Sequence, residues 1–269
     1  MSGLLALTGR EIKKWYKNPF VLFISLVQPI IWMGLFGKAM NLGAIVPSNL
    51  PPGTPNPLTA FLGGVGDYFS FMAVGMLAFV VLFTTMFSGM SIVWDRRLGF
   101  LNKVLSTPAS RGSIILSKVA ISVIRALVQA GIVLIAAVIL GLVVGPDFTP
   151  LTLLAVFAAL TLMSIGLSAM FVAIAIRSTK WETQMAIMNL LNLPLLFASN
   201  ALFPTASMPS WLQDIAMINP VTYGTEAARQ LILLPTNWGV VAGDFIFLGV
   251  FAAAFAGIGI ALSWRYLSK

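Results

Sequence analysis

The chain has 269 residues, of which 59% are hydrophobic and 9% are charged, and its formal net charge at pH 7 is +8. A soluble domain carries about a quarter charged residues, so this composition excludes a water-soluble protein. The sequence contains no cysteine and no histidine, which excludes disulfides and thiolate chemistry and removes the commonest metal ligand and general base.

Six apolar stretches are each long enough to cross a bilayer, which takes about 20 residues. They cover residues 20–37, 68–93, 126–144, 151–176, 185–203 and 245–263. Each is predicted to be helical, because only a helix satisfies its own backbone hydrogen bonds in lipid. The sequence therefore predicts an all-α integral membrane protein with six transmembrane helices, in a single transmembrane domain over residues 1–269.

Lysine and arginine occur almost entirely in alternate gaps between these stretches. Of the 16 such residues, only Lys38 and Arg229 fall on the side opposite the chain ends in a six-span arrangement. Cytoplasmic loops carry the excess of lysine and arginine, so both termini are predicted to be cytoplasmic. The positive net charge then follows from orientation, and no nucleic-acid partner is expected.

At the N-terminus, residues 3–17 place apolar side chains at helical spacing opposite a basic face. This pattern predicts an amphipathic interfacial helix in the cytoplasmic headgroup layer, with an ordinary basic flank as the alternative. Asn18 and Pro19 then end the helix before the first span.

The longest predicted cytoplasmic loop is 94–112. A short helix over 94–105 would have an apolar face that either binds a partner or packs back on the bilayer surface. The next helix is expected to protrude from the membrane, because its polar residues share one face. These residues are Arg111, Lys118, Ser122, Arg125 and Gln129. Arg125 is expected to snorkel to the interface, with a substrate site there as the alternative.

Several polar side chains lie inside the spans, where they either hold helices together or line a path. The candidates for lining a pathway are Gln28, Thr84, Thr85, Ser88, Asn189, Asn192, Ser199 and Asn200. The fifth span is the most polar of the six.

The predicted external segment 204–238 is rich in apolar residues but is divided by Asn219 and Pro220. Each half is too short to cross a bilayer. We expect a short external pair of re-entrant or interfacial helices between spans five and six. Its marked residues are Trp211, Asn219, Pro220, Tyr223, Glu226 and Arg229.

Taken in order along the chain, these segments resemble the membrane permeases of ABC-2 type transporters, particularly the drug-resistance and nodulation-type exporters of bacteria and archaea. The segments that carry the resemblance are Asn18-Pro19, 27–32, Asp95 to Gly99, 105–108, Met208 to Leu212, Asn219 to Tyr223, and Glu226 with Arg229.

The resemblance implies a half-transporter in the cytoplasmic (inner) membrane of a bacterium or archaeon. It would pair with a second permease protomer as a homodimer and bind two copies of a cytoplasmic ABC ATPase. The loop after span two would carry the coupling helix, with Asp95 as its acidic residue, and 178–184 would make a second contact. The ATPase-coupling residues would be Asp95, Arg96, Arg97, Phe100, Leu101 and Lys103.

No lysine in the chain is followed by serine or threonine, so a G-x-x-x-x-G-K-[ST] phosphate loop is absent. We therefore expect no cofactor bound by this chain, with ATP and Mg held by the partner subunit. The predicted function is export of an amphipathic substrate (a drug, lipid-like molecule or glycoconjugate) by alternating access. An ATP-independent carrier or channel is the alternative. An intramembrane enzyme is disfavoured because histidine is absent and because no two facing carboxylates are expected within the membrane: Asp67, Asp147, Asp214, Glu226 and Asp244 lie in external loops or at the outer boundary.

Overall fold

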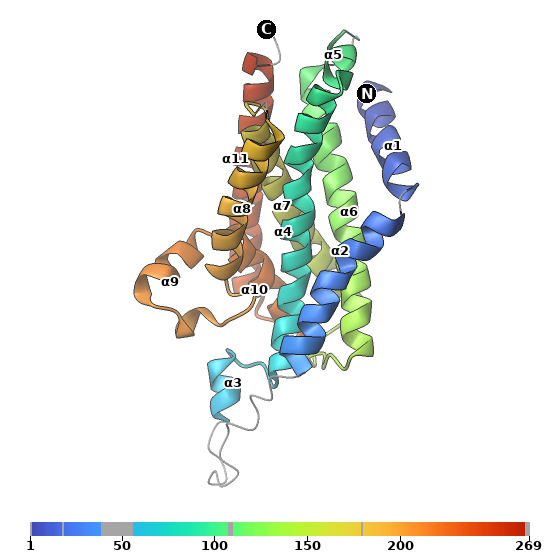
Figure 1. The fold of residues 1–269 in the computed structure, drawn as a ribbon. Coiled ribbons are helices and arrows are strands. Elements are labelled where there is room, and N and C mark those ends of the chain that lie inside the picture. The colour runs from blue at the N-terminus through green and yellow to red at the C-terminus, as the bar shows by residue number, and fades with distance from the viewer. Residues whose placement is uncertain (1, 18, 39–55, 107–109, 179, 267–269) are drawn as a thin grey trace.

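The computed structural model describes residues 2–17, 19–38, 56–106, 110–178 and 180–266, and every regular element in these ranges is helical (Figure 1). The elements are α1 (Ser2–Tyr16), α2 (Pro19–Trp32), η1 (Met33–Lys38), α3 (Pro57–Phe61), α4 (Tyr68–Arg97), α5 (Phe100–Leu105), α6 (Arg111–Ile139), α7 (Pro150–Ala175), α8 (Trp181–Phe197), η3 (Thr205–Ser207), α9 (Ser210–Met217), α10 (Pro220–Ile232) and α11 (Trp238–Tyr266). The all-α prediction is confirmed for this part of the chain.

Within the described ranges, four helices are long and apolar enough to cross a membrane, namely α4, α6, α7 and α11. The apolar helix α2 has 14 residues and runs directly into the six-residue π-helix η1. Helix α8 has 17 residues. The start of α1, the short helix α5 and the last turns of α11 lie at one end of the bundle, which we call the α5 end (top in Figure 1). Helices α3 and α9 lie toward the opposite end, the α9 end.

Helix α4 forms the core of the bundle. In its most apolar window 89% of the residues are buried, against 17% in the corresponding window of α11. A helix that is apolar all round belongs in a core, and α4 packs on α6, α7, α8 and α10. The close approach of α4 to α7 depends on glycine, because a Cβ at Gly89 of α4 would lie 2.5 Å from the carbonyl oxygen of Phe171 on α7.

Several helix boundaries differ from the predicted ones. Helix α4 continues through Trp94 to Arg97 and is separated from α5 by Gly99, so the interpretation of 94–105 as one helix is wrong. The physical reason is that Gly99 has φ +69, which interrupts a right-handed helix. Gly141, with φ +101, likewise follows the end of α6, whereas the third span was predicted to extend to 144.

The fifth and sixth predicted spans also shift. Helix α8 starts at Trp181 and ends at Phe197, and residues 198–203, which were placed in the fifth span, are not helical. Here the Asn219 amide donates to the carbonyls of Leu195 at 2.8 Å and Ala198 at 2.6 Å, which supplies partners for the free carbonyls of a helix end. Helix α11 begins at Trp238, before the predicted start of the sixth span at 245.

Candidate functional site

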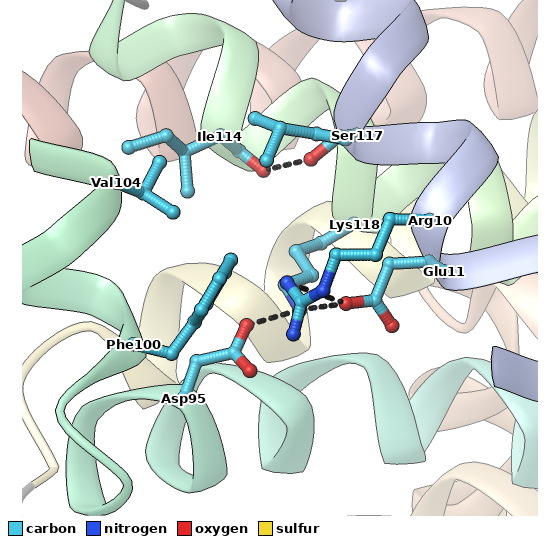
Figure 2. Close-up of a pocket in the computed structure, with 9 residues that line it drawn as sticks. Arg10, Glu11, Asp95, Phe100, Val104, Ile114, Ser117 and Lys118 are labelled. Carbon is cyan, nitrogen blue, oxygen red and sulfur yellow. Dashed lines mark hydrogen bonds and ion pairs between the residues drawn. The ribbon is translucent and has the colours of Figure 1, made fainter. Parts of the chain in front are cut away.

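Three buried charges join three helices at the α5 end. The Nζ of Lys118 on α6 lies 2.5 Å from Oδ2 of Asp95 on α4 and 3.1 Å from Oε1 of Glu11 on α1 (Figure 2). All three side chains are 6–7% exposed. Arg10 adds an ion pair with Glu11 at 3.5 Å. Burying charges is costly unless they are paired, so this cluster requires all its members together.

The space beside this cluster is too small for a ligand. Its volume is about 10 Å³, which is close to the minimum for a single water molecule. Apolar side chains close it: Phe100 and Val104 of α5 pack with Ile114 of α6 and Leu7 of α1 (Figure 2 shows the first three). The guanidinium of Arg10 lies 3.5 Å from the centre of the Phe100 ring. Ion pairs and apolar contacts in this region therefore hold α1, α4, α5 and α6 together, and we call it the junction at the α5 end.

Part of the apolar face of α5, which was predicted to contact the ATPase, packs against other helices of the chain. Its apolar residues Phe100 and Val104 meet α1 and α6, so this part of the apolar face already has partners within the chain. Arg97 and Lys103 are exposed. The side chain of Leu101, a further predicted coupling residue, lies outside the described part of the structure, as do residues 107–109.

Arg96 connects the first predicted coupling segment to the second. Its two terminal nitrogens donate to the carbonyl oxygens of Ser178 and Ile176, each at 2.7 Å, just after the end of α7. Trp94 and Trp181 pack edge to face beside them, with ring centroids 4.8 Å apart. A two-pronged guanidinium contact fixes geometry as well as distance. The end of α4 is thus attached to the α7–α8 loop.

Of the predicted coupling residues, Asp95 and Arg96 have partners inside the chain. Sequence reasoning missed Glu11 as a member of the cluster and assigned Lys118 only to a polar face. The available signal was that Glu11 is the only acidic residue before Asp67 and lies within a basic helix.

The amphipathic helix α1 and Arg125 contact each other. Arg125 on α6 donates to the backbone oxygen of Glu11 at 3.4 Å and lies 5.9 Å from the centre of the Trp15 ring. Leu5 of α1 is 68% exposed. One side of α1 therefore packs on α6, while another part of α1 leaves apolar side chains exposed.

The predicted pathway residues differ in their burial and in their hydrogen-bond partners. Thr84 donates to Gln129, and the amide nitrogen of Gln129 donates to Ser25 at 2.6 Å, which links α4, α6 and α2. Thr85, Ser88 and Ser199 donate to backbone carbonyls of their own turn and are buried. Gln28 on α2 and Asn189 on α8 are exposed, whereas Asn192 is buried with no partner for its oxygen among the described residues.

At the α9 end, the predicted external residues form a second polar cluster. The Asn200 amide donates to Glu226 at 2.9 Å. Arg229 is 3% exposed, and its guanidinium donates to the carbonyls of Phe71 at 3.2 Å and Ala201 at 3.1 Å. Helix α10 is thereby fixed against α4 and the segment after α8.

The remaining marked residues organise α9 and α10. Asn219 precedes α10 and accepts from the backbone of Val221 at 3.0 Å, while Pro220 occupies the first turn. Tyr223 donates to the backbone oxygen of Met217 at 2.6 Å. Trp211 is 62% exposed. The cluster at the α9 end thus combines buried polar contacts with an uncovered apolar surface on α9.

Comparison with known proteins gives a consistent family. Residues 2–233 match the family model described as ABC-2 type transporter. A protein of Cyanophora paradoxa named as the transport permease ycf38 is 31% identical over 229 residues, covering 85% of this chain and 73% of that protein. Its namesake in Porphyra purpurea is 32% identical over 235 residues, covering 87% and 74%. The daunorubicin resistance ABC transporter permease protein DrrB1 of Streptomyces coeruleorubidus is 25% identical over 175 residues, covering 64% and 60%.

Proposed function

Since the chain belongs to the ABC-2 type transporter family, we propose that it is the membrane-spanning subunit of an exporter driven by a separate ATPase. Its relatives include proteins named as drug-resistance ABC transporter permeases, which supports an export role. ATP and Mg would be bound by the partner subunit, in keeping with the absence of a phosphate-loop sequence in this chain.

The proposed topology has six spans. Helices α4, α6, α7 and α11 supply four, the continuous stretch of α2 and η1 supplies one, and α8 supplies the last. The excess of lysine and arginine supports a cytoplasmic position for the α5 end and both termini. We propose the cytoplasmic membrane of a bacterium or archaeon, as the family resemblance implies. Helix α1 would lie at the interface, since Leu5 and Ile12 are exposed beside the face that packs on α6.

The observation that carries the coupling proposal is the junction at the α5 end. A force applied to α5 reaches α4 through the short turn at Gly99. From Asp95 it passes to α6 and α1 through Lys118, and from Arg96 it passes to the α7–α8 loop. The ATPase would contact the exposed Arg97 and Lys103. Movement of these helices together would open the path alternately to the two sides.

The proposed pathway lies between two protomers. Gln28 and Asn189 are exposed on α2 and α8, and Ile24 and Ile31, one turn to either side of Gln28 on α2, are 53% and 49% exposed. Such a surface offers amide groups among apolar side chains without fixed charge, which suits an amphipathic substrate. An ATP-independent carrier is the competing proposal, and it would need no exposed contact at α5.

Co-purification tests the proposal. A tagged chain isolated from its native membrane should bring with it a soluble ATPase and ATP hydrolysis. The double variant Arg97→Glu, Lys103→Glu should lose this partner, because charge reversal at an exposed docking site opposes binding. The double variant Lys13→Glu, Lys17→Glu, which reverses two exposed lysines of the N-terminal segment, is the matched control. Retention of the ATPase by the double variant would refute the docking site, and transport by the purified chain alone in liposomes would favour the carrier.

A further inference from the structure

A second cavity lies at the α9 end, where α9, α10, α11 and the segment after α8 meet. Its volume is about 210 Å³. The polar residues that line it include Asn200, Gln213, Thr222, Glu226 and Asp244. Unlike the space beside Lys118, this cavity is large enough for a small organic group.

Three residues that line this cavity carry buried polar atoms without a hydrogen-bond partner in the described part of the chain. Asn200 is 6% exposed and Asp244 is 5% exposed. Oδ1 of Asn200, Oδ2 of Asp244 and the hydroxyl of Thr222 are buried without a hydrogen bond within the described part of the chain. Buried polar groups are normally paired, so these three atoms have hydrogen-bonding capacity left for a group bound beside them.

A group bound beside these atoms must donate hydrogen bonds. An amide oxygen and a carboxylate oxygen can only accept. The orientation of the Asn200 amide is fixed, because its nitrogen donates to the Glu226 carboxylate at 2.9 Å, and a carboxylate cannot donate in return. Two of the three unpaired atoms are therefore acceptors that point to a donor-bearing group.

The two ionisable carboxyl side chains that line the cavity, Glu226 and Asp244, are both acidic. Glu226 and Asn200 also line a neighbouring cavity together with Arg229, whose guanidinium is directed at the carbonyls of Phe71 and Ala201. In the described residues, no group of three histidine, cysteine or acidic side chains is arranged to hold a metal ion. An organic ammonium group satisfies both the charge and the need for donors.

The surroundings of the cavity are apolar. Ala216, Met217 and Tyr223 also line it, and the Tyr223 ring stacks on Phe247 with centroids 3.8 Å apart. Met217 on α9 is 63% exposed. We propose that this cavity binds the protonated amine of an amphipathic cation, with Asp244, Glu226 and Asn200 around the ammonium group and α9 along the apolar body. This inference rests on the proposed export function and names the substrate class.

The test measures binding of 2-phenylethylamine to the full-length chain in zwitterionic lipid nanodiscs by calorimetry, with empty nanodiscs subtracted. The neutral isostere 2-phenylethanol should bind on the order of ten-fold more weakly, because it lacks the charge. Asp244→Asn should weaken amine binding by a similar factor and leave alcohol binding unchanged. Asp214→Asn, an exposed carboxylate on α9 outside the cavity, should bind the amine as the unmodified chain does.

Glu226→Gln provides a second variant should Asp244→Asn fail to fold, and it should also weaken amine binding. Equal binding of amine and alcohol, or unchanged amine binding in the folded variants, would overturn the inference. The measurement needs no ATPase. Amine binding without ATPase co-purification would therefore refute the proposed function alone, and ATPase co-purification without amine binding would refute this site alone.

Discussion

Lys118 neutralises two buried carboxylates that come from helices far apart along the chain. Replacing it with methionine removes the ion pairs to Asp95 at 2.5 Å and to Glu11 at 3.1 Å and leaves both carboxylates buried. Removing one partner of a buried ion pair costs about 3–5 kcal/mol, so Lys118→Met should clearly lower the thermal unfolding temperature in detergent.

Two further variants separate charge from packing at this site. Lys103→Met removes an exposed lysine on α5 and should leave the unfolding temperature nearly unchanged. The triple variant Glu11→Gln, Asp95→Asn, Lys118→Met removes all three charges and should recover much of the lost stability. A triple variant as unstable as Lys118→Met would show that the ion pairs are not the source of the effect.

Arg96 should control local opening of the α7–α8 loop. Lysine keeps the charge but cannot donate to both Ile176 and Ser178 in the same planar geometry. Arg96→Lys should therefore speed hydrogen exchange at the backbone amide of Ser178 by roughly ten-fold, as expected for losing one charged hydrogen bond. Arg97→Lys, at an exposed position, is the control, and equal exchange in the two variants would contradict the role of Arg96.

At the scale of elements, the close packing of α4 makes a sharp prediction. An added Cβ at Gly75 would overlap the carbonyl oxygen of Ala201, which cannot move without displacing the segment after α8. Gly75→Ala should destabilise the protein by at least about 1–3 kcal/mol, measured by thermal unfolding. Gly249→Ala on α11, where nothing lies within 4 Å, should be neutral or slightly stabilising. Similar behaviour of the two alanine variants would show that α4 does not pack as described.

Helix positions were largely predictable because apolar composition and length are local properties of the sequence. The exact helix ends were harder to predict. Gly99 and Gly141 end helices because their φ angles are positive. At the end of α8, the carbonyl of Ala198 accepts a hydrogen bond from Asn219, which is 21 residues further along the chain. These constraints come from the folded backbone, which hydropathy does not report.

Partners were harder to predict than positions. The helical spacing of Lys118 and Gln129 correctly suggests one polar face, but spacing alone does not identify what covers that face. Lys118 binds Glu11, 107 residues away, and Gln129 binds Ser25, 104 residues away. The family resemblance assigns Asp95 to an ATPase contact, and that role stays a prediction. Its intramolecular ion pair with Lys118 is a separate finding that the resemblance did not include.

For the whole molecule, the orientation of the bundle in the membrane can be tested directly because the chain contains no cysteine. Lys103→Cys on α5 and Ser210→Cys at the start of α9 place single thiols at exposed positions near opposite ends (Figure 1 shows the helices). The distribution of lysine and arginine predicts that the α5 end is cytoplasmic. A membrane-impermeant maleimide should therefore label Ser210→Cys in intact cells and Lys103→Cys only after the membrane is permeabilised. The unmodified chain is the blank, and labelling of Lys103→Cys in intact cells would reverse the orientation and move the ATPase contact away from α5.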